Sequence, residues 1–302
     1  MKAIKQIVLL LTILLTSKMV SQPFVDLASF NIQSSKAAFK SNSSWENKTL
    51  NYTINLFYPK ELKNKDVLLF RMNAEKIQSE IYIPDTKTTT TSIISSVTLA
   101  IGYQWISESK KWKTTFMAIP KIASDFKEPL SKDDWQYGVF FLENYSINKK
   151  LKLKTGLYYN KEAFGNFFVP LLGLDWKAND RLNLYGTLPG NYQIEYALAK
   201  DKCFTGLSFK TFTRSFQLSS QQKSNYVRYD EMLLKAFIEK YVYKKILLFA
   251  EVGYSFGKSP LQYTSETNEL NTSNPVYTRL KNYPFFNVGL AYRVRLDSDK
   301  NK

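Results

Sequence analysis

Every second residue is apolar across an eleven-residue segment near the end of the chain. The apolar positions are Phe286, Val288, Leu290, Tyr292, Val294 and Leu296, and Asn287, Gly289, Ala291, Arg293 and Arg295 lie between them. This period of two predicts a strand with one apolar and one polar face. Only a short charged tail follows it, Asp297 to Lys302. A terminal amphipathic strand, on a chain that opens with an export signal, is typical of a transmembrane β-barrel of a Gram-negative outer membrane.

The first 21 residues have the layout of that export signal. Lys2 and Lys5 form a basic start, and Ile7–Leu15 forms an apolar core of nine residues. A transmembrane helix needs about 20 apolar residues, so this core is too short to span a bilayer. We predict a cleavable signal peptide over residues 1–21 and one barrel over residues 22–302. The single cysteine, Cys203, does not follow the apolar core, which argues against a lipid anchor.

The composition favours a barrel over a soluble exported protein. The chain contains 20 Tyr and 21 Phe, beside only 11 Gly and 10 Pro. Aromatic residues are favoured in strands and in the girdles where a barrel meets lipid headgroups. The mean hydropathy of −0.30 agrees with this class, because a barrel strand presents only one face to lipid. No segment after the signal approaches 18 consecutive apolar residues, so we predict no transmembrane helix.

Alternating segments recur along the chain and predict an all-β, antiparallel up-and-down barrel of 12–14 strands without a plug domain. Leu50–Tyr58, Ser95–Ser107 and Ile246–Phe256 are clear examples. Phe204–Leu218 changes its alternation part-way, which predicts a β-bulge. The longest polar segment, at about residues 258–283, predicts a surface loop.

Alternation alone does not say which face meets lipid, because a soluble lipocalin-like barrel shows the same period with its apolar face inward. Here the polar face combines charged residues with Gly and Ser, which favours a wet lumen. We assign to the lumen Lys152, Lys154, Arg181, Glu195, Lys235, Glu239, Glu251, Arg293 and Arg295. We assign to the lipid face Val97, Leu99, Ile101, Leu248, Val252, Leu290 and Val294. Acids and bases that pair across the bore would leave at most a narrow path, with a mild preference for anions.

Several short motifs resemble a known family. They are KIASD at Lys121–Asp125, KDD at Lys132–Asp134, VPLLGLDW at Val169–Trp176, Asn179–Leu182, Leu188–Pro189 and the closing FFNVGLAYRVRL at Phe285–Leu296. Together they are similar to domain-of-unknown-function family 6268, over nearly the whole mature chain. The resemblance implies a barrel in the outer membrane. It implies no activity, because the family has none assigned.

The chain contains no histidine. Outer-membrane barrel enzymes generally use histidine as a general base, and histidine-based metal sites are excluded with it. The adjacent acids Asp133 and Asp134 lack EF-hand spacing and fit a solvated turn. We therefore predict a protein that is not an enzyme and has no cofactor. It is either a narrow channel or transporter for small or hydrophobic solutes, or a structural surface protein. The alternative is a soluble periplasmic β-barrel that binds a ligand in a closed cavity.

The charge balance bears on the partners. The formal net charge is +16, but the basic residues are scattered rather than clustered in a stripe, which argues against nucleic acid. Lysines at the barrel rim would meet lipopolysaccharide phosphates. We expect a monomer in the outer membrane of a Gram-negative bacterium. Its expected partners are outer-membrane lipid, lipopolysaccharide and the barrel-assembly machinery.

Overall fold

The computed structural model describes residues 23–40, 43–219, 225–257, 260–264 and 279–296. The strands are β1 (Phe24–Ala38), β2 (Glu46–Glu61), β3 (Val67–Ile83), β4 (Thr88–Ile106), β5 (Trp112–Ser124), β6 (Trp135–Ser146), β7 (Leu151–Glu162), β8 (Gly165–Lys177), β9 (Leu182–Leu188), β10 (Asn191–Ala199), β11 (Cys203–Leu218), β12 (Asn225–Tyr243), β13 (Ile246–Gly257), β14 (Leu261–Thr264) and β15 (Tyr283–Arg295). A 3-10 turn, η1 (Lys132–Asp134), precedes β6. In this described part, no helix is long and apolar enough to cross a membrane.

Two predicted segments fall wholly or largely outside the described residues. The signal peptide at residues 1–21 is one, and most of the surface loop at about 258–283 is the other. The described part of that loop differs from the prediction. It contains β14, which pairs antiparallel with the first four residues of β12.

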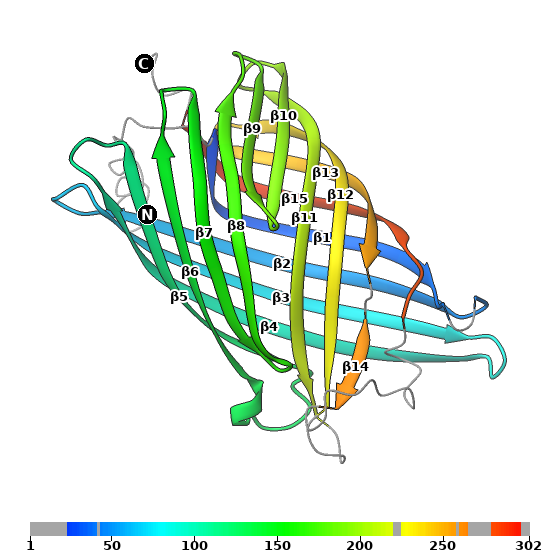
Figure 1. Cartoon of the computed structure of the whole chain (residues 1–302). Coiled ribbons are helices and arrows are strands. Elements are labelled where there is room, and N and C mark those ends of the chain that lie inside the picture. The colour runs from blue at the N-terminus through cyan, green and yellow to red at the C-terminus, as the bar shows by residue number, and fades with distance from the viewer. Residues whose placement is uncertain (1–22, 41–42, 220–224, 258–259, 265–278, 297–302) are drawn as a thin grey trace, which may run out of the picture.

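The strands close into a single ring (Figure 1). Each strand from β1 to β12 pairs with the next, β13 pairs with β15, and β15 pairs with β1. In the described chain, fourteen strands thus form the ring, and β14 lies outside it as a four-residue addition to β12. Every strand of this antiparallel ring has a neighbour on both sides, which is the architecture of a transmembrane β-barrel, although β8 pairs with the short β9 only over Leu172–Lys177. The predicted up-and-down barrel is confirmed, and the fourteen strands of the described ring are the upper limit of the predicted range.

The two ends of the ring differ in their connections. We call one end the short-turn end; its turns are residues 62–66, 107–111, 147–150, 178–181, 200–202 and 244–245, each of two to five residues. Asparagine builds two of them. The Oδ1 atom of Asn148 accepts from the backbone N–H groups of Lys150 and Leu151, at 2.8 and 3.0 Å. Such side-chain caps are why asparagine favours tight turns. We call the opposite end the loop end; it includes the ten-residue connection 125–134.

The exterior of the ring is apolar. Six residues assigned to the lipid face, Val97, Leu99, Ile101, Leu248, Val252 and Leu290, are 38–57% exposed. Val294 is the exception at 2%, in the β1–β15 pairing opposite Val25. Exposed aromatic residues mark both ends: Trp105, Trp112, Trp176 and Tyr243 at the short-turn end, and Tyr82, Trp135 and Tyr137 toward the loop end. Two aromatic girdles around an apolar belt do not fit a soluble barrel, whose apolar face would point inward.

At the loop end the ring is pinched, because β11 also pairs with β5. Five strands separate them in the ring, yet Gln217 forms a parallel bridge with Ser124. The backbone N–H of Asp125 donates to the Gln217 carbonyl at 3.0 Å, and the hydroxyl of Ser219 donates to the Asp125 carboxylate at 2.5 Å. These contacts draw two distant walls together, so the bore narrows there.

The pinch also explains the irregular pattern of β11. Its register with β12 is unbroken from Cys203 to Leu218, so the predicted bulge is wrong. Instead, both faces of its last residues are covered. The hydroxyl of Ser215 donates to Glu162 on β7 at 2.6 Å, and the Nε2 of Gln136 on β6 donates to the Ser215 carbonyl at 3.1 Å. Burial on both sides removes the alternation that a half-buried strand would show.

Candidate functional site

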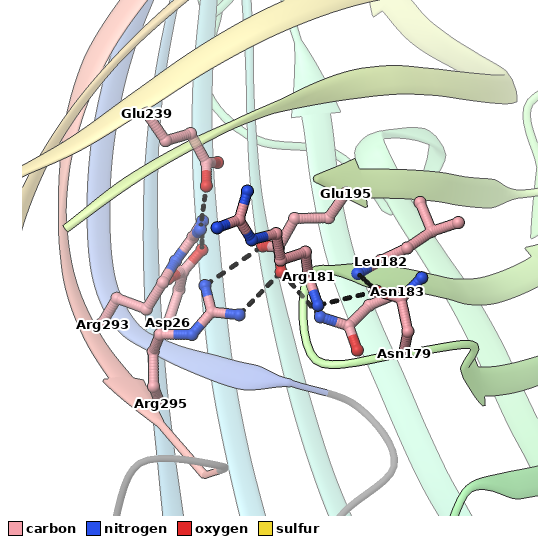
Figure 2. A network of polar contacts seen from close by, with 9 residues as sticks. All are labelled: Asp26, Asn179, Arg181, Leu182, Asn183, Glu195, Glu239, Arg293 and Arg295. Atoms are coloured by element: carbon pink, nitrogen blue, oxygen red, sulfur yellow. Dashed lines mark hydrogen bonds and ion pairs between the residues drawn. The ribbon is translucent and has the colours of Figure 1, made fainter. Parts of the chain in front are cut away.

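Inside the short-turn end, arginines of β15 anchor a layer of charges. Arg293 donates from Nε and Nη2 to the two carboxylate oxygens of Asp26 on β1, at 2.5 and 2.9 Å (Figure 2). Its Nη1 also donates to Glu239 on β12, at 2.5 Å. The Arg293 side chain is only 6% exposed. One guanidinium therefore joins three strands inside the bore.

The second arginine spans a wider gap. Arg295 donates from Nη2 and Nη1 to the two carboxylate oxygens of Glu195 on β10, at 2.6 and 3.2 Å (Figure 2). Three strands, β11 to β13, lie between β10 and β15 in the ring. Glu195 has no exposed surface, and the amide of Asn183 donates to it at 3.2 Å. A two-pronged pair of this kind is among the stronger hydrogen-bonded ion pairs, but it stabilises only while both partners remain.

Aromatic rings complete this layer. The guanidinium carbon of Arg293 lies 3.4 Å from the ring centre of Phe24, and that of Arg295 lies 3.8 Å from the ring centre of Phe204. Phe24 also packs edge-on against Tyr185, with ring centres 5.6 Å apart. All three rings are buried. Cations on aromatic faces are favourable where water is excluded, so the layer fills this end with matched contacts.

Four further residues assigned to the lumen lie on strands. Lys235 donates to both carboxylate oxygens of Glu251, at 2.8 and 2.9 Å. Lys154 forms an ion pair with Asp175 on the neighbouring strand β8. Lys152 is buried on β7. These pairs join adjacent strands, whereas the pairs made by Arg293 and Arg295 also cross the bore.

Arg181 does not fit its assignment to the lumen. It is exposed and lies in the short turn between β8 and β9. The Oδ1 of Asn179 accepts from the backbone N–H groups of Arg181 and Leu182, at 2.8 and 2.9 Å, which holds Arg181 in the turn rather than on a strand. A hydrogen bond with Tyr196 raises the pKa of the Arg181 guanidinium.

Sequence reasoning missed a third charged group. Arg214 on β11 pairs with Glu75 on β3 and lies 3.7 Å from Glu231 on β12. Asn51 donates to the same Glu75 carboxylate at 2.7 Å. A signal for Glu75 was present, because the apolar face of β3 carries Phe70 and places odd-numbered residues opposite. Arg214 was hidden by the irregular pattern of β11.

Between the ends, the bore holds a polar cavity of about 720 Å³. Amide and hydroxyl side chains line much of it: Ser29, Asn31, Gln33, Asn51, Thr53, Asn55, Asn73, Thr187, Asn191, Gln193 and Asn287. Several bond to one another across strands. Asn73 donates to Asn55 at 2.8 Å, and Asn55 donates to Ser29 at 3.2 Å. A cavity with this lining is suited to water and polar solutes rather than to an apolar guest.

A narrow polar strip continues from this cavity toward the loop end. It encloses about 20 Å³ and shares Gln33, Asn51 and Arg214 with the cavity. The hydroxyl of Tyr283 donates to Glu231 at its far side. The space is close to that of one water molecule, so the strip is a constriction.

Beside the strip, the loop end is filled by apolar side chains. Ile77, Ile94, Ala123, Phe216, Leu218, Val227 and Tyr229 form one buried cluster. Ile77 lies on the same face of β3 as Glu75, which lines the cavity, so the cluster lies inside the bore. Its members come from β3 to β5 on one wall and from β11 and β12 on the other. It therefore packs where the walls are pinched together.

The adjacent acids Asp133 and Asp134 have a structural role. Asp134 accepts from the backbone N–H of Ser131 at 2.7 Å, and Ser131 accepts from the N–H of Asp133 at 3.2 Å. This reciprocal cap starts η1. Among the described residues, no group of three or more His, Cys, Asp or Glu side chains is placed to hold a metal ion.

The model of one protein family, Domain of unknown function (DUF6268), matches residues 27–293. The chain belongs to this family. The resemblance seen in the sequence motifs is thereby confirmed, and the match includes part or all of every strand, with Asp26 and Arg295 of the charged layer just outside it.

Solved structures with a similar fold include three channels or porins. The COG4313 outer membrane channel from Pseudomonas putida F1 is 8% identical, with 89% of this chain and 96% of that chain covered and a TM-score of 0.46. A TodX monoaromatic hydrocarbon channel mutant is 9% identical, with 90% and 91% covered and a TM-score of 0.43. The NanC porin is 9% identical, with 88% and 100% covered and a TM-score of 0.37. No curated protein matches the chain.

Proposed function

We propose that this protein is an outer-membrane β-barrel whose bore forms a narrow channel for small polar solutes. The observation that carries the proposal is the cavity of about 720 Å³, lined by amides, hydroxyls and charges, inside a ring whose exterior is apolar. A hydrophobic solute would meet unfavourable contacts there, because polar groups would lose their hydrogen-bonding partners. The cavity chemistry therefore favours polar cargo over hydrophobic cargo.

The same features favour a small conductance. The charged layer around Arg293 and Arg295 occupies one end of the bore, and the strip of about 20 Å³ is the constriction at the other. The cavity lining includes six cations, Arg71, Lys154, Lys210, Arg214, Lys235 and Arg293, and four carboxylates, Asp26, Glu75, Glu239 and Glu251. This excess of positive charge favours anions.

The proposed orientation follows from the connections. Bacterial barrels have short periplasmic turns, so the short-turn end would face the periplasm. Lys36 and Lys48 lie toward the loop end and would meet lipopolysaccharide phosphates there. The closed ring needs no second copy, which supports a monomer inserted by the barrel-assembly machinery.

A structural surface protein is the second candidate, favoured by the side chains that occupy both ends of the bore. Single-channel recording of the refolded protein in planar bilayers separates the two. A channel gives small, stable steps that carry chloride better than potassium. A structural barrel gives no steps under any voltage or salt. Large conductance with cation preference would contradict both.

A separate experiment tests the cellular location of the protein and the closure of its ring. The protein should fractionate with the outer membrane and migrate faster on gels before boiling than after it, since a closed ring of hydrogen-bonded strands resists detergent. Recovery in the soluble periplasmic fraction, without this shift, would overturn the outer-membrane proposal.

A further inference from the structure

We propose that the central cavity is a binding site for a polyhydroxylated organic anion, a carboxylate of about monosaccharide size, held between Arg71 and Lys210. This inference rests on the proposed function and names its class of solute.

The first argument is how the cations of the cavity are paired. Four of the six cations in its lining have carboxylate partners: Lys154 with Asp175, Arg214 with Glu75, Lys235 with Glu251, and Arg293 with Asp26 and Glu239. Arg71 and Lys210 form no ion pair with any carboxylate of the described residues. Each instead lies over an aromatic ring, Phe57 at 5.5 Å and Phe212 at 5.4 Å. Two positive charges thus face the cavity with no carboxylate at ion-pair distance, and Asp26 acts on Arg71, and Glu75 and Glu251 on Lys210, only from farther away.

The second argument is exposure. Arg71 and Lys210 lie among the strands that enclose the bore, yet both keep accessible surface, whereas Arg293 is 6% exposed. The accessible surface of Lys210 lies in the cavity, because it shares the inward face of β11 with Arg214. A partly hydrated cation is available to a ligand, whereas an arginine already held by two carboxylates is not.

The third argument is position. Arg71 is on β3 and Lys210 is on β11, with five ring strands between them on one side and seven on the other. They therefore face the cavity from nearly opposite walls; in Figure 1, β11 crosses in front of β3. A solute that contacts both must occupy the bore itself rather than a groove on one wall.

The fourth argument is the polar lining between the two cations. Amides such as those of Asn55, Asn73 and Gln193 both donate and accept hydrogen bonds, as hydroxyl groups do. A halide ion would pair with the two cations, and the amides would then form hydrogen bonds only with water. A carboxylate with several hydroxyls would satisfy both, since the planar guanidinium of Arg71 matches a carboxylate in two-pronged geometry.

The test uses D-gluconate as the anion and D-sorbitol as its neutral counterpart. The full chain, refolded in planar bilayers, carries a chloride current to which each solute is added. We expect gluconate to block this current at concentrations where sorbitol does not. In the double variant R71Q/K210M, the half-blocking concentration should rise by about tenfold or more, roughly the loss of one charge-assisted contact.

The matched control is K63Q/K200M, which removes the same charge from exposed turns at the short-turn end. It should keep the wild-type block. Heat-modifiable mobility checks that each variant has folded. Equal block in wild type and R71Q/K210M, or equal loss in the control, would overturn the inference.

Binding is also measured without conduction, by equilibrium dialysis of labelled gluconate against the refolded protein in detergent. Binding that is lost in R71Q/K210M, in a protein that carries no current, would support the site and refute the channel. Conversely, a chloride current in a protein that binds no gluconate would support the channel and refute the site.

Discussion

The two ends of the bore are filled by opposite chemistry. At the short-turn end, Arg293 and Arg295 bind carboxylates of β1, β10 and β12 through hydrogen bonds of 2.5–3.2 Å. At the loop end, the apolar cluster that includes Ile94 and Phe216 packs where β5 and β11 meet. The charged layer narrows the bore with groups that water can also solvate, whereas the apolar cluster leaves only the polar strip of about 20 Å³ beside it.

This difference separates two roles. The ion pairs of a charged layer depend on geometry, so the loss of one partner leaves the other charge buried and unpaired. If the layer opens, water can solvate these charges. An apolar cluster is stabilised in proportion to the area it buries, and it excludes water as long as it stays packed. We therefore expect the charged layer and the polar strip to control conductance and the apolar cluster to contribute mainly to stability.

The largest expected effect is at the charged end. Glu195→Ala leaves the guanidinium of Arg295 buried without its carboxylate, which should lower the free energy of unfolding by about 3–5 kcal/mol. Denaturant unfolding of the refolded barrel, followed by tryptophan fluorescence, measures this. The exposed Asp180→Ala is the control and should change little. In E195L/R295L both charges are gone, so much of the loss should be recovered. A double variant as unstable as E195A would refute the explanation.

Truncation of a buried side chain at the apolar end should lower the free energy of unfolding, as it does in any packed core. Ile94→Ala removes a side chain that is 2% exposed, at an expected cost of about 2–4 kcal/mol. The same unfolding experiment, repeated at high salt, sharpens the comparison. The cost of I94A should not depend on salt, because no charge is involved. The exposed Ile101→Ala faces lipid and is the matched control. Equal losses in both variants would contradict the placement of Ile94 inside the bore.

Conductance should respond to changes in the charged layer and not to changes in the apolar cluster. The double substitution R293A/R295A empties the charged layer, so the single-channel conductance should rise by about twofold or more, with selectivity shifted toward cations by Asp26, Glu195 and Glu239. Recording in asymmetric KCl gives both quantities. I94A is the comparison and should stay near the wild-type value. A rise of the same size in I94A would show that the apolar end limits the current.

The smallest effect is expected outside the bore. Arg181→Gln changes an exposed turn residue, so the stability should change by less than about 0.5 kcal/mol and the conductance should not change. The same recordings and unfolding curves test this. An altered conductance in R181Q would return Arg181 to the lumen, where the alternation of the sequence had placed it.

The alternation of apolar residues predicted the barrel, and the charged residues that share the opposite face with Gly and Ser predicted that the apolar face points outward. A side chain in a strand points to the face opposite its neighbours, whatever the strand pairs with. Leu248 and Leu290 could therefore be assigned to the outside once the opposite, charged face had been assigned to the lumen, and the structure leaves both exposed. Arg181 was wrongly assigned to the lumen because it directly precedes a strand, so the alternation of apolar and polar residues in that strand appears to include this turn residue.

Which charges meet was decided by the tertiary structure. Arg295 and Glu195 are separated by 100 residues, and Asp26 meets Arg293 only because the first strand pairs with the last. Such pairs depend on the register of every strand in the ring, which no local pattern contains. The pinch between β5 and β11, the covered faces of β11 and the cavity that leaves Arg71 and Lys210 exposed follow from the same closure. The sequence determined which face each residue takes, while closure of the ring decided what that residue meets.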